Sequence, residues 1–269
     1  EICACLVGSE MCIRDRYTVD GLLKRWPDTK YRDWYLGDWL APMGVDAGNQ
    51  ASVDLVSNCF ISECLSTMYK TAITLGKREE AEEFAIRREK LNKLIHQTFY
   101  RADEGIYSTG SQLDMCYPML VGVVPDSLYN KVKENVVAMT EEKYKGHIAV
   151  GLVGVPILTE WAVRNKQVDF FYQMMKKRDY PGYLYMIDHG ATATWEYWSG
   201  ERSRVHNCYN GIGTWFYQAV GGIRLDEAKP GYRHFYVDPQ IPNGVIWAKV
   251  TKESPYGTIA VNWKLKDDN

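Results

Sequence analysis

The spacing of apolar residues changes period along the chain, and this change constrains the fold more than any other feature. In residues 50–75, apolar side chains recur every three or four positions, which is the spacing of one helix face. After Gly222 the pattern alternates every second residue, as in strands exposed on one face. The sequence therefore predicts a helical region followed by a smaller β region.

The helical region divides into paired segments separated by Gly and Pro. A second helix is predicted at residues 77–98, where acidic residues fill the first turns and basic residues the later ones, in agreement with the helix dipole. Shorter helices are predicted at residues 112–120, 127–139, 150–165, 167–177 and 206–220. Because no strand pattern is interleaved with them, antiparallel helical hairpins are favoured over a βαβ sheet.

Three strands are predicted after the helices, at residues 234–237, 245–250 and 258–265, with Pro, Asn-Gly and Tyr-Gly turns between them. Three short strands cannot close a sandwich. No internal repeat of fixed period is visible, which disfavours a solenoid.

Composition excludes several classes of protein. The 269 residues have a net charge of −2, with 46% hydrophobic and 25% charged residues, which is typical of a globular chain. No apolar run approaches the roughly 20 residues of a membrane span. The near-zero net charge disfavours a nucleic-acid surface.

Aromatic residues are abundant, at 13% with nine Trp and nineteen Tyr. Flat amphipathic rings suit the faces of sugars, but most tryptophans in any protein pack in the core. Composition alone leaves both interpretations open.

The seven cysteines form no CxxC motif. Cys3, Cys5 and Cys12 have no partner pair at zinc spacing, so no metal site and no cofactor are predicted. The remaining cysteines are expected to be buried small hydrophobes: Cys59, Cys64, Cys116 and Cys208. Unpaired cysteines leave the compartment, cytoplasm or periplasm, undecided.

The first sixteen residues differ in composition from the rest and lack the features of a signal peptide. Residues 3–16 resemble the translation of a sequencing-library adapter. We therefore expect residues 1–16 to be non-native and the native protein to begin upstream of Tyr17.

Two segments, residues 35–42 and 180–198, combine carboxylates, aromatic rings and glycine, as candidate sites on loops do. Glu196 is flanked by Trp195, Tyr197 and Trp198, and such a setting partly removes a carboxylate from water and suits it to acid or base work. The alternative is an ion pair with Arg202 or Arg204.

The other candidates have structural alternatives. Asp38 beside Trp39 fits a sugar site or a helix N-cap with a packed indole. His189 is expected to be a structural turn residue, and His96 an exposed residue of the second helix.

Several motifs of this sequence together resemble those of a known family. The C-terminal signature of bacterial α-L-rhamnosidases of glycoside hydrolase family 78 resembles residues 190–198, Ser203, Arg204, His206, 213–223, 230–232 and 254–257, and an earlier block of that family resembles residues 37–40. The resemblance covers the chain from Tyr17 onward. It implies a mainly α fold: part of an (α/α)6 toroid of helical hairpins at residues 17–224, followed by the start of a C-terminal β-sandwich at 225–269.

The resemblance also implies an activity. Family members remove terminal α-L-rhamnose with inversion, which requires one carboxylic acid and one carboxylate that activates water. Glu196 matches the Glu of the family's TTxWE motif and would be the general base. His206 matches the family's SxNH motif and would hydrogen-bond a rhamnose hydroxyl. The partner implied is a rhamnoside.

The aromatic residues would complete the site. By the same resemblance, Asp38 and Trp39 would position the sugar and stack on it. Trp195 and Trp198 would form the wall around the base.

The sequence departs from the family pattern at Val205, Asn207 and Asn210, which affects the polar contacts around His206. No block like the acidic DERLGW segment, which carries the family's general acid, is present. We therefore expect a chain with half a catalytic site. The alternatives are an inactive sugar-binding or purely structural helical fragment, and a toroid hydrolase for another sugar.

Overall fold

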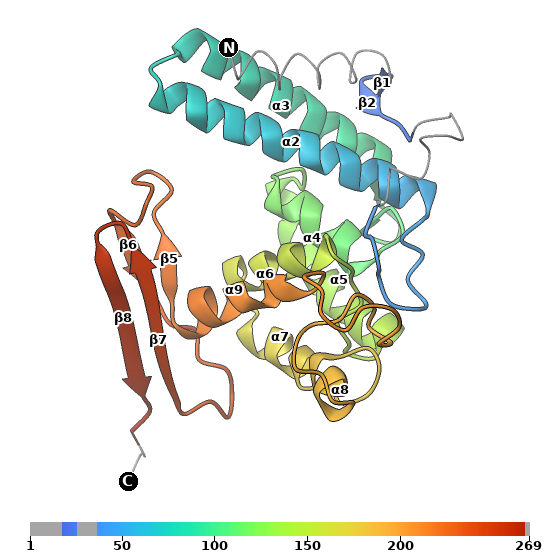
Figure 1. Cartoon of the computed structure of the whole chain (residues 1–269). Coiled ribbons are helices and arrows are strands. Elements are labelled where there is room, and N and C mark those ends of the chain that lie inside the picture. Colours follow the sequence, from blue (N-terminus) through green and yellow to red (C-terminus); the bar gives the residue numbers. More distant parts are fainter. Residues whose placement is uncertain (1–17, 26–36, 267–269) are drawn as a thin grey trace. The chain divides into compact units, whose positions relative to one another are not determined.

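A computed structural model describes residues 18–25 and 37–266 (Figure 1). The chain divides into two compact units, Glu1–Met139 and Thr140–Asn269, each of which is described by itself. The adapter-like segment lies outside the described residues, together with Cys3, Cys5 and Cys12.

The first unit is organised around a long helical hairpin. Helix α2 (Gln50–Thr74) begins where the side chain of Asn49 accepts the backbone N–H of Ala51 at 3.0 Å. Helix α3 (Arg78–Phe99) has Glu79 and Glu80 in its first turn. Both helices were predicted to within about one residue, because their apolar spacing and charge order extend over many turns.

Two short strand pairs accompany this hairpin. Strands β1 (Thr18–Val19) and β2 (Leu22–Leu23) are attached to α2 by Asn58, whose side chain accepts from Leu23 N–H at 3.0 Å and donates to Leu23 O at 2.8 Å. Strands β3 (Tyr100–Arg101) and β4 (Ile106–Tyr107) pair after α3. Neither pair was predicted, since two residues are too few to show a period.

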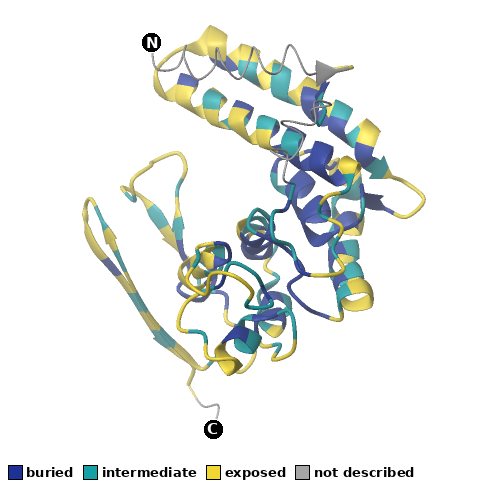
Figure 2. Cartoon of the chain, turned by 45° about the vertical axis from the view of Figure 1, so that its right-hand side comes forward, coloured by how far each residue is buried: buried dark blue, intermediate teal, exposed yellow. Residues whose placement is uncertain are grey.

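Helices α4 (Gln112–Leu120) and α5 (Asp126–Tyr144) follow. Figure 2 shows α4 as almost entirely buried. Asp114 of α4 is 0% exposed and is satisfied by three hydrogen bonds: Ser52 Oγ of α2 donates at 2.6 Å, and Thr109 donates from Oγ1 at 2.6 Å and from its backbone N–H at 3.1 Å. Burial raises the pKa of Asp114, against the opposing effect of these donors. This carboxyl ties α4 to α2.

The second unit begins with helices α6 (Gly154–Arg164), α7 (Val168–Met175) and α8 (Tyr183–Asp188). A 3₁₀ turn η2 (Asn210–Ile212), a short α9 (Gly213–Trp215) and a π-type turn η3 (Phe216–Val220) follow. The indole of Trp215 stacks on Tyr172 of α7, with centroids 6.0 Å apart. Helix α8 was not predicted, and the helix predicted at residues 206–220 begins only at Asn210.

The chain ends in two antiparallel strand pairs. Strand β5 (Ile223–Leu225) pairs with β6 (Phe235–Val237), and β7 (Trp247–Ser254) pairs with β8 (Gly257–Lys264). Two side-chain hydrogen bonds hold this region to the helices: the buried Gln240 donates to Val163 O at 2.9 Å, and the half-buried Trp263 donates to Val220 O at 2.8 Å.

The fold class is confirmed: the chain is mainly helical with strand pairs at its C-terminal end. The predicted strands correspond to β6, β7 and β8, whereas the three-residue β5 was missed. Within residues 18–25 and 37–266, no helix has both the length and the apolar character that crossing a membrane requires.

We predict that Asp114→Ala destabilises the first unit by about 3 kcal/mol, because it leaves the buried hydroxyls of Ser52 and Thr109 without their acceptor. Urea unfolding followed by circular dichroism would measure this. Asp103→Ala, in the exposed β3–β4 turn, is the control and should change stability by less than about 0.5 kcal/mol. A loss below about 1 kcal/mol for Asp114→Ala would contradict the structural role of this carboxyl.

Candidate functional site

The loop between α8 and η2 carries four of the predicted site residues, namely Trp195, Glu196, Trp198 and His206. In Figure 1 it is the orange loop next to α8. Two backbone hydrogen bonds close it: Glu196 N–H donates to Ser203 O at 2.9 Å, and His206 N–H donates to Thr194 O at 2.8 Å. Residues 194–196 therefore run beside residues 203–206, which brings the segments carrying Glu196 and His206 together.

The turn between these segments wraps around Trp195, which is 1% exposed. Gly200 has φ +81°, and a Cβ on it would lie 2.7 Å from the indole. On the same ring, the Arg204 guanidinium lies 5.0 Å from the centroid. Only glycine provides both this backbone conformation and this approach.

Trp198 is also 1% exposed and is surrounded by protein. Its ring stacks on Tyr209 with centroids 4.1 Å apart, meets Tyr183 edge-on at 5.2 Å, and donates from Nε1 to Val150 O at 2.8 Å. Both predicted wall indoles thus pack inside the loop, with their faces covered in this structure. Contact of either indole with a sugar stays a prediction.

Two tyrosines contact Trp198: Tyr183, which lies in the candidate segment 180–198 but had no predicted role, and Tyr209, which the sequence did not indicate. Tyr209 OH donates to the backbone carbonyl of Glu196 at 3.2 Å, and Tyr183 OH donates to the carbonyl of Tyr209 at 2.8 Å. Burial raises the pKa of Tyr183, so its hydroxyl keeps its proton. These bonds fix the position of the Glu196 backbone.

The Glu196 carboxylate is half-buried and accepts the Ser203 N–H on Oε2 at 3.3 Å. It forms no ion pair with Arg202 or Arg204, whose guanidinium groups lie over the rings of Tyr197, at 5.5 Å, and Trp195. The alternative prediction, a structural ion pair between Glu196 and one of these arginines, is therefore wrong. The pKa of the buried Cys208 thiol is raised to about 11, by burial and then by the negative charge of Glu196.

His206 is held as a hydrogen-bond donor. Its Nδ1 accepts the backbone N–H of Cys208 at 3.1 Å, so the neutral ring carries its proton on Nε2. Nearby, the Thr194 hydroxyl donates to the side-chain oxygen of Asn210, one of the positions that depart from the family pattern. The Asn at this position therefore supports the loop.

Asp38 and Trp39 lie in the first unit, in the loop that precedes α2. Asp38 is 4% exposed, and its carbonyl accepts the N–H of Ala41 at 3.2 Å. Gly37 has φ +58°, with Ala47 O only 2.6 Å from where a Cβ would stand. Since Asn49 caps α2, Asp38 is not the cap of that helix. Tyr35 and Leu36 lie outside the described residues.

Three further predictions have clear outcomes. His189 is a structural turn residue, as expected: its Nδ1 contacts Tyr185 O at 2.8 Å. The prediction that His96 is simply exposed is wrong, because the ring is half-buried against Tyr100 and Tyr107. Of the four cysteines expected to be buried, Cys64 is exposed.

Among the described residues, no group of three His, Cys, Asp or Glu side chains could hold a metal ion.

Comparison with known families gives two matches in consecutive order. Residues 11–220 match the model of the bacterial α-L-rhamnosidase six-hairpin glycosidase domain, and residues 222–269 match the bacterial α-L-rhamnosidase C-terminal domain. The two matches follow the order of the helical and β regions that the resemblance implied, and the first begins at residue 11, within the segment expected to be non-native.

Individual proteins similar to this chain agree with these family matches. An α-L-rhamnosidase of Alteromonas sp. (strain LOR) is 26% identical over 250 residues, which are 86% of this chain and 27% of that protein. The structure of an α-L-rhamnosidase of Streptomyces avermitilis complexed with L-rhamnose superposes with a TM-score of 0.84 at 21% identity, over 97% of this chain and 25% of that one. An α-L-rhamnosidase structure from Aspergillus terreus gives 0.78 at 21% identity, over 85% of this chain and 28% of that one.

The chain thus spans about a quarter of the length of the relatives it matches. The shared fold confirms a partial helical toroid followed by a β region.

We predict that Gly200→Ala costs more stability than Gly190→Ala. Both glycines have φ above +80°, so each alanine carries about 1–2 kcal/mol of backbone strain, but only at Gly200 does the new methyl group meet an indole. We expect a further loss of about 2 kcal/mol at Gly200. Urea unfolding monitored by tryptophan fluorescence would measure the stability of both variants. Equal losses of stability would contradict the prediction, because they would show that the loop adjusts around Trp195 to accommodate the methyl group.

Proposed function

The chain belongs to the bacterial α-L-rhamnosidase family of six-hairpin glycosidases, and from this membership we propose that it is part of an inverting hydrolase that removes terminal α-L-rhamnose from rhamnosides. The observation that carries the proposal is the environment of the Glu196 carboxylate. Its carboxylate is half-buried, held by a backbone N–H, and paired with no cation among the described residues. A general base needs such a position, because an ion pair would hold the lone pairs that must accept the proton of water.

In an inverting reaction, water attacks the anomeric carbon from the face opposite the leaving group. Glu196 would accept the proton of that water. Oε2 accepts from Ser203, whereas Oε1 has no hydrogen-bond partner within the described parts of the chain and is therefore the oxygen offered to water. Tyr209 and Ser203 would keep the carboxylate in place during the reaction.

The remaining roles concern the sugar. His206 would donate from Nε2 to a rhamnose hydroxyl, supported by the tautomer that Cys208 N–H selects. Trp195 and Trp198 would support the wall around the base from inside the loop. For Asp38 and Trp39, the proposed roles of positioning and stacking rest on the resemblance of residues 37–40 alone.

The second carboxyl is proposed to come from residues outside this sequence. The absence of a DERLGW-like block supports this, so the chain alone should be inactive. We also propose a division into a non-native segment at 1–16, toroid helices at 17–224 and a β domain at 225–269. The two family matches, which adjoin between residues 220 and 222, support the last boundary.

Hydrolysis of p-nitrophenyl α-L-rhamnoside tests the proposal, using this chain and a longer form that includes the upstream residues of the same gene. We expect the longer form to release p-nitrophenol and the chain alone to release none. Glu196→Gln in the longer form should lower kcat about 10²–10⁴-fold, because a general base contributes that much. Glu201→Gln, an exposed neighbour in the same loop, is the matched control and should retain activity.

Each contrary outcome is informative. Turnover by this chain alone would show that both carboxyls lie within it. An active Glu196→Gln variant would remove Glu196 as the base. If the longer form ignores the rhamnoside but cleaves another glycoside, the substrate class is wrong, and proton NMR of the first product would separate inversion from retention.

A further inference from the structure

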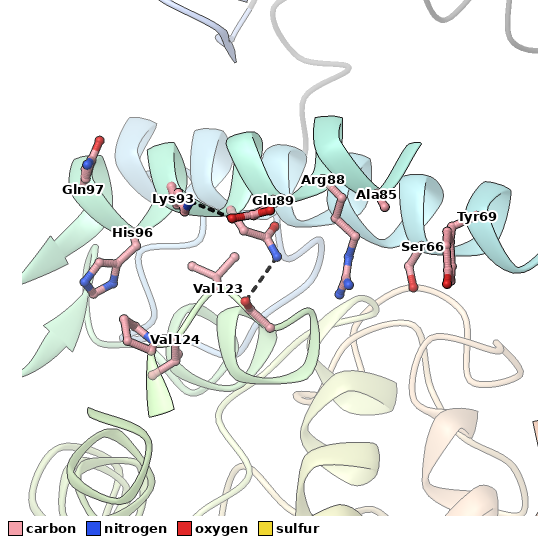
Figure 3. A pocket seen from close by; sticks show the side chains of 13 residues that line it. Ser66, Tyr69, Ala85, Arg88, Glu89, Lys93, His96, Gln97, Val123 and Val124 are labelled. Atoms are coloured by element: carbon pink, nitrogen blue, oxygen red, sulfur yellow. Dashed lines mark hydrogen bonds and ion pairs between the residues drawn. The ribbon is translucent and has the colours of Figure 1, made fainter. Parts of the chain in front are cut away.

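A hollow of about 560 Å³ lies in the first unit, and none of the residues proposed for the sugar site lines it. Helices α2 and α3 form one side, and the turn at residues 122–125 forms the other (Figure 3). Apolar groups make much of the lining: Tyr69, Ala85, Val123, Val124 and Pro125. The volume suits a small organic molecule.

Arg88 gives this hollow its charge. Its guanidinium donates to Val121 O at 2.6 Å, Nε is buried with no hydrogen-bond partner, and no carboxylate among the described residues pairs with it. Burial lowers the pKa of Arg88, which shows that its positive charge is poorly solvated. The carbonyl at the end of α4 supplies only the partial negative charge of a helix terminus.

The other charged groups of the hollow cancel. Glu89 and Lys93 are one helical turn apart on α3 and pair at 2.6 Å, as Figure 3 shows. The hollow therefore has one uncompensated positive charge, on Arg88. A partly buried charge without a counter-ion is unfavourable, and an anionic ligand would relieve it.

His96 adds a neutral donor to the lining. The Tyr107 hydroxyl lies 2.6 Å from Nδ1, and burial raises the pKa of that phenol, so Tyr107 keeps its proton and donates it. Burial also lowers the pKa of His96, and the neutral ring then carries its proton on Nε2. Thus His96 presents an N–H without adding a second full charge.

We propose that this hollow binds a small organic monocarboxylate, with the carboxylate on Arg88 and the apolar body against Val123, Val124 and Pro125. One unpaired cation matches one negative charge. A phosphate dianion would bring excess negative charge close to Glu89, and a neutral ligand would leave the guanidinium unpaired.

Benzoate is the probe, and benzamide is the neutral control of the same shape. Both are titrated into the full chain by isothermal calorimetry at low salt. Benzoate should bind at least about tenfold more tightly than benzamide, because only the carboxylate can form a charge-assisted hydrogen bond with Arg88. Arg88→Gln, which keeps an amide donor for Val121 O, should abolish this preference. Arg87→Gln changes the preceding residue on α3, which pairs with Glu83 and does not line the hollow, and it should retain the preference.

Equal affinity for benzoate and benzamide in the unmodified chain overturns the proposal, and this comparison needs no folded variant. Unchanged benzoate binding by a folded Arg88→Gln chain overturns it as well. Sulfate binding as tightly as benzoate would make the site one for inorganic anions instead. None of these outcomes depends on glycosidase activity.

Discussion

The packing of Trp198 against Tyr209 and Tyr183 is the interaction on which the proposed site depends. Stacking at 4.1 Å and edge contact at 5.2 Å contribute beyond the burial of the rings, by roughly 0.5–1.5 kcal/mol per pair. The same tyrosines then donate hydrogen bonds, and the one from Tyr209 reaches the backbone of Glu196. A loop without regular secondary structure thereby holds a carboxylate in a fixed place, which is what a general base requires.

Two carboxyl groups of this chain show how environment separates structure from chemistry. Asp114 is fully buried and receives three hydrogen bonds from protein donors, so it is closed off from any ligand. Glu196 is half-buried and receives one weak bond from Ser203. The sequence motif singled out Glu196, but it did not reveal how many hydrogen-bond donors each carboxyl group receives. The distinction comes from the partners that each finds in the fold.

The parts of the fold that could be predicted are those whose signal is local and repeated. Helices α2 and α3 extend over many turns, so their period and charge order stand out, and β7 and β8 alternate over eight residues each. Helix α8 has only six residues and β5 three, too few for either period to appear. Glu196 and His206 were found through motifs, whereas the contacts of Tyr183 and Tyr209 were missed because they join positions up to 26 residues apart. His96 was misjudged because the charged face of α3 does not reveal Tyr107 behind it.

The abundance of aromatic residues has a different meaning once burial is known. Trp161, Trp195, Trp198 and Trp215 are all 1% exposed or less, so much of this aromatic content packs helices and loops instead of offering open platforms. Under the proposed function, sugar recognition in the second unit would therefore rest mainly on polar groups that the aromatic residues hold in place. Rhamnose is a deoxy sugar, and its remaining hydroxyl groups distinguish it from other sugars. Directed donors such as His206 Nε2 would discriminate between sugars more sharply than ring faces, because a mismatched hydroxyl leaves a half-buried donor unpaired.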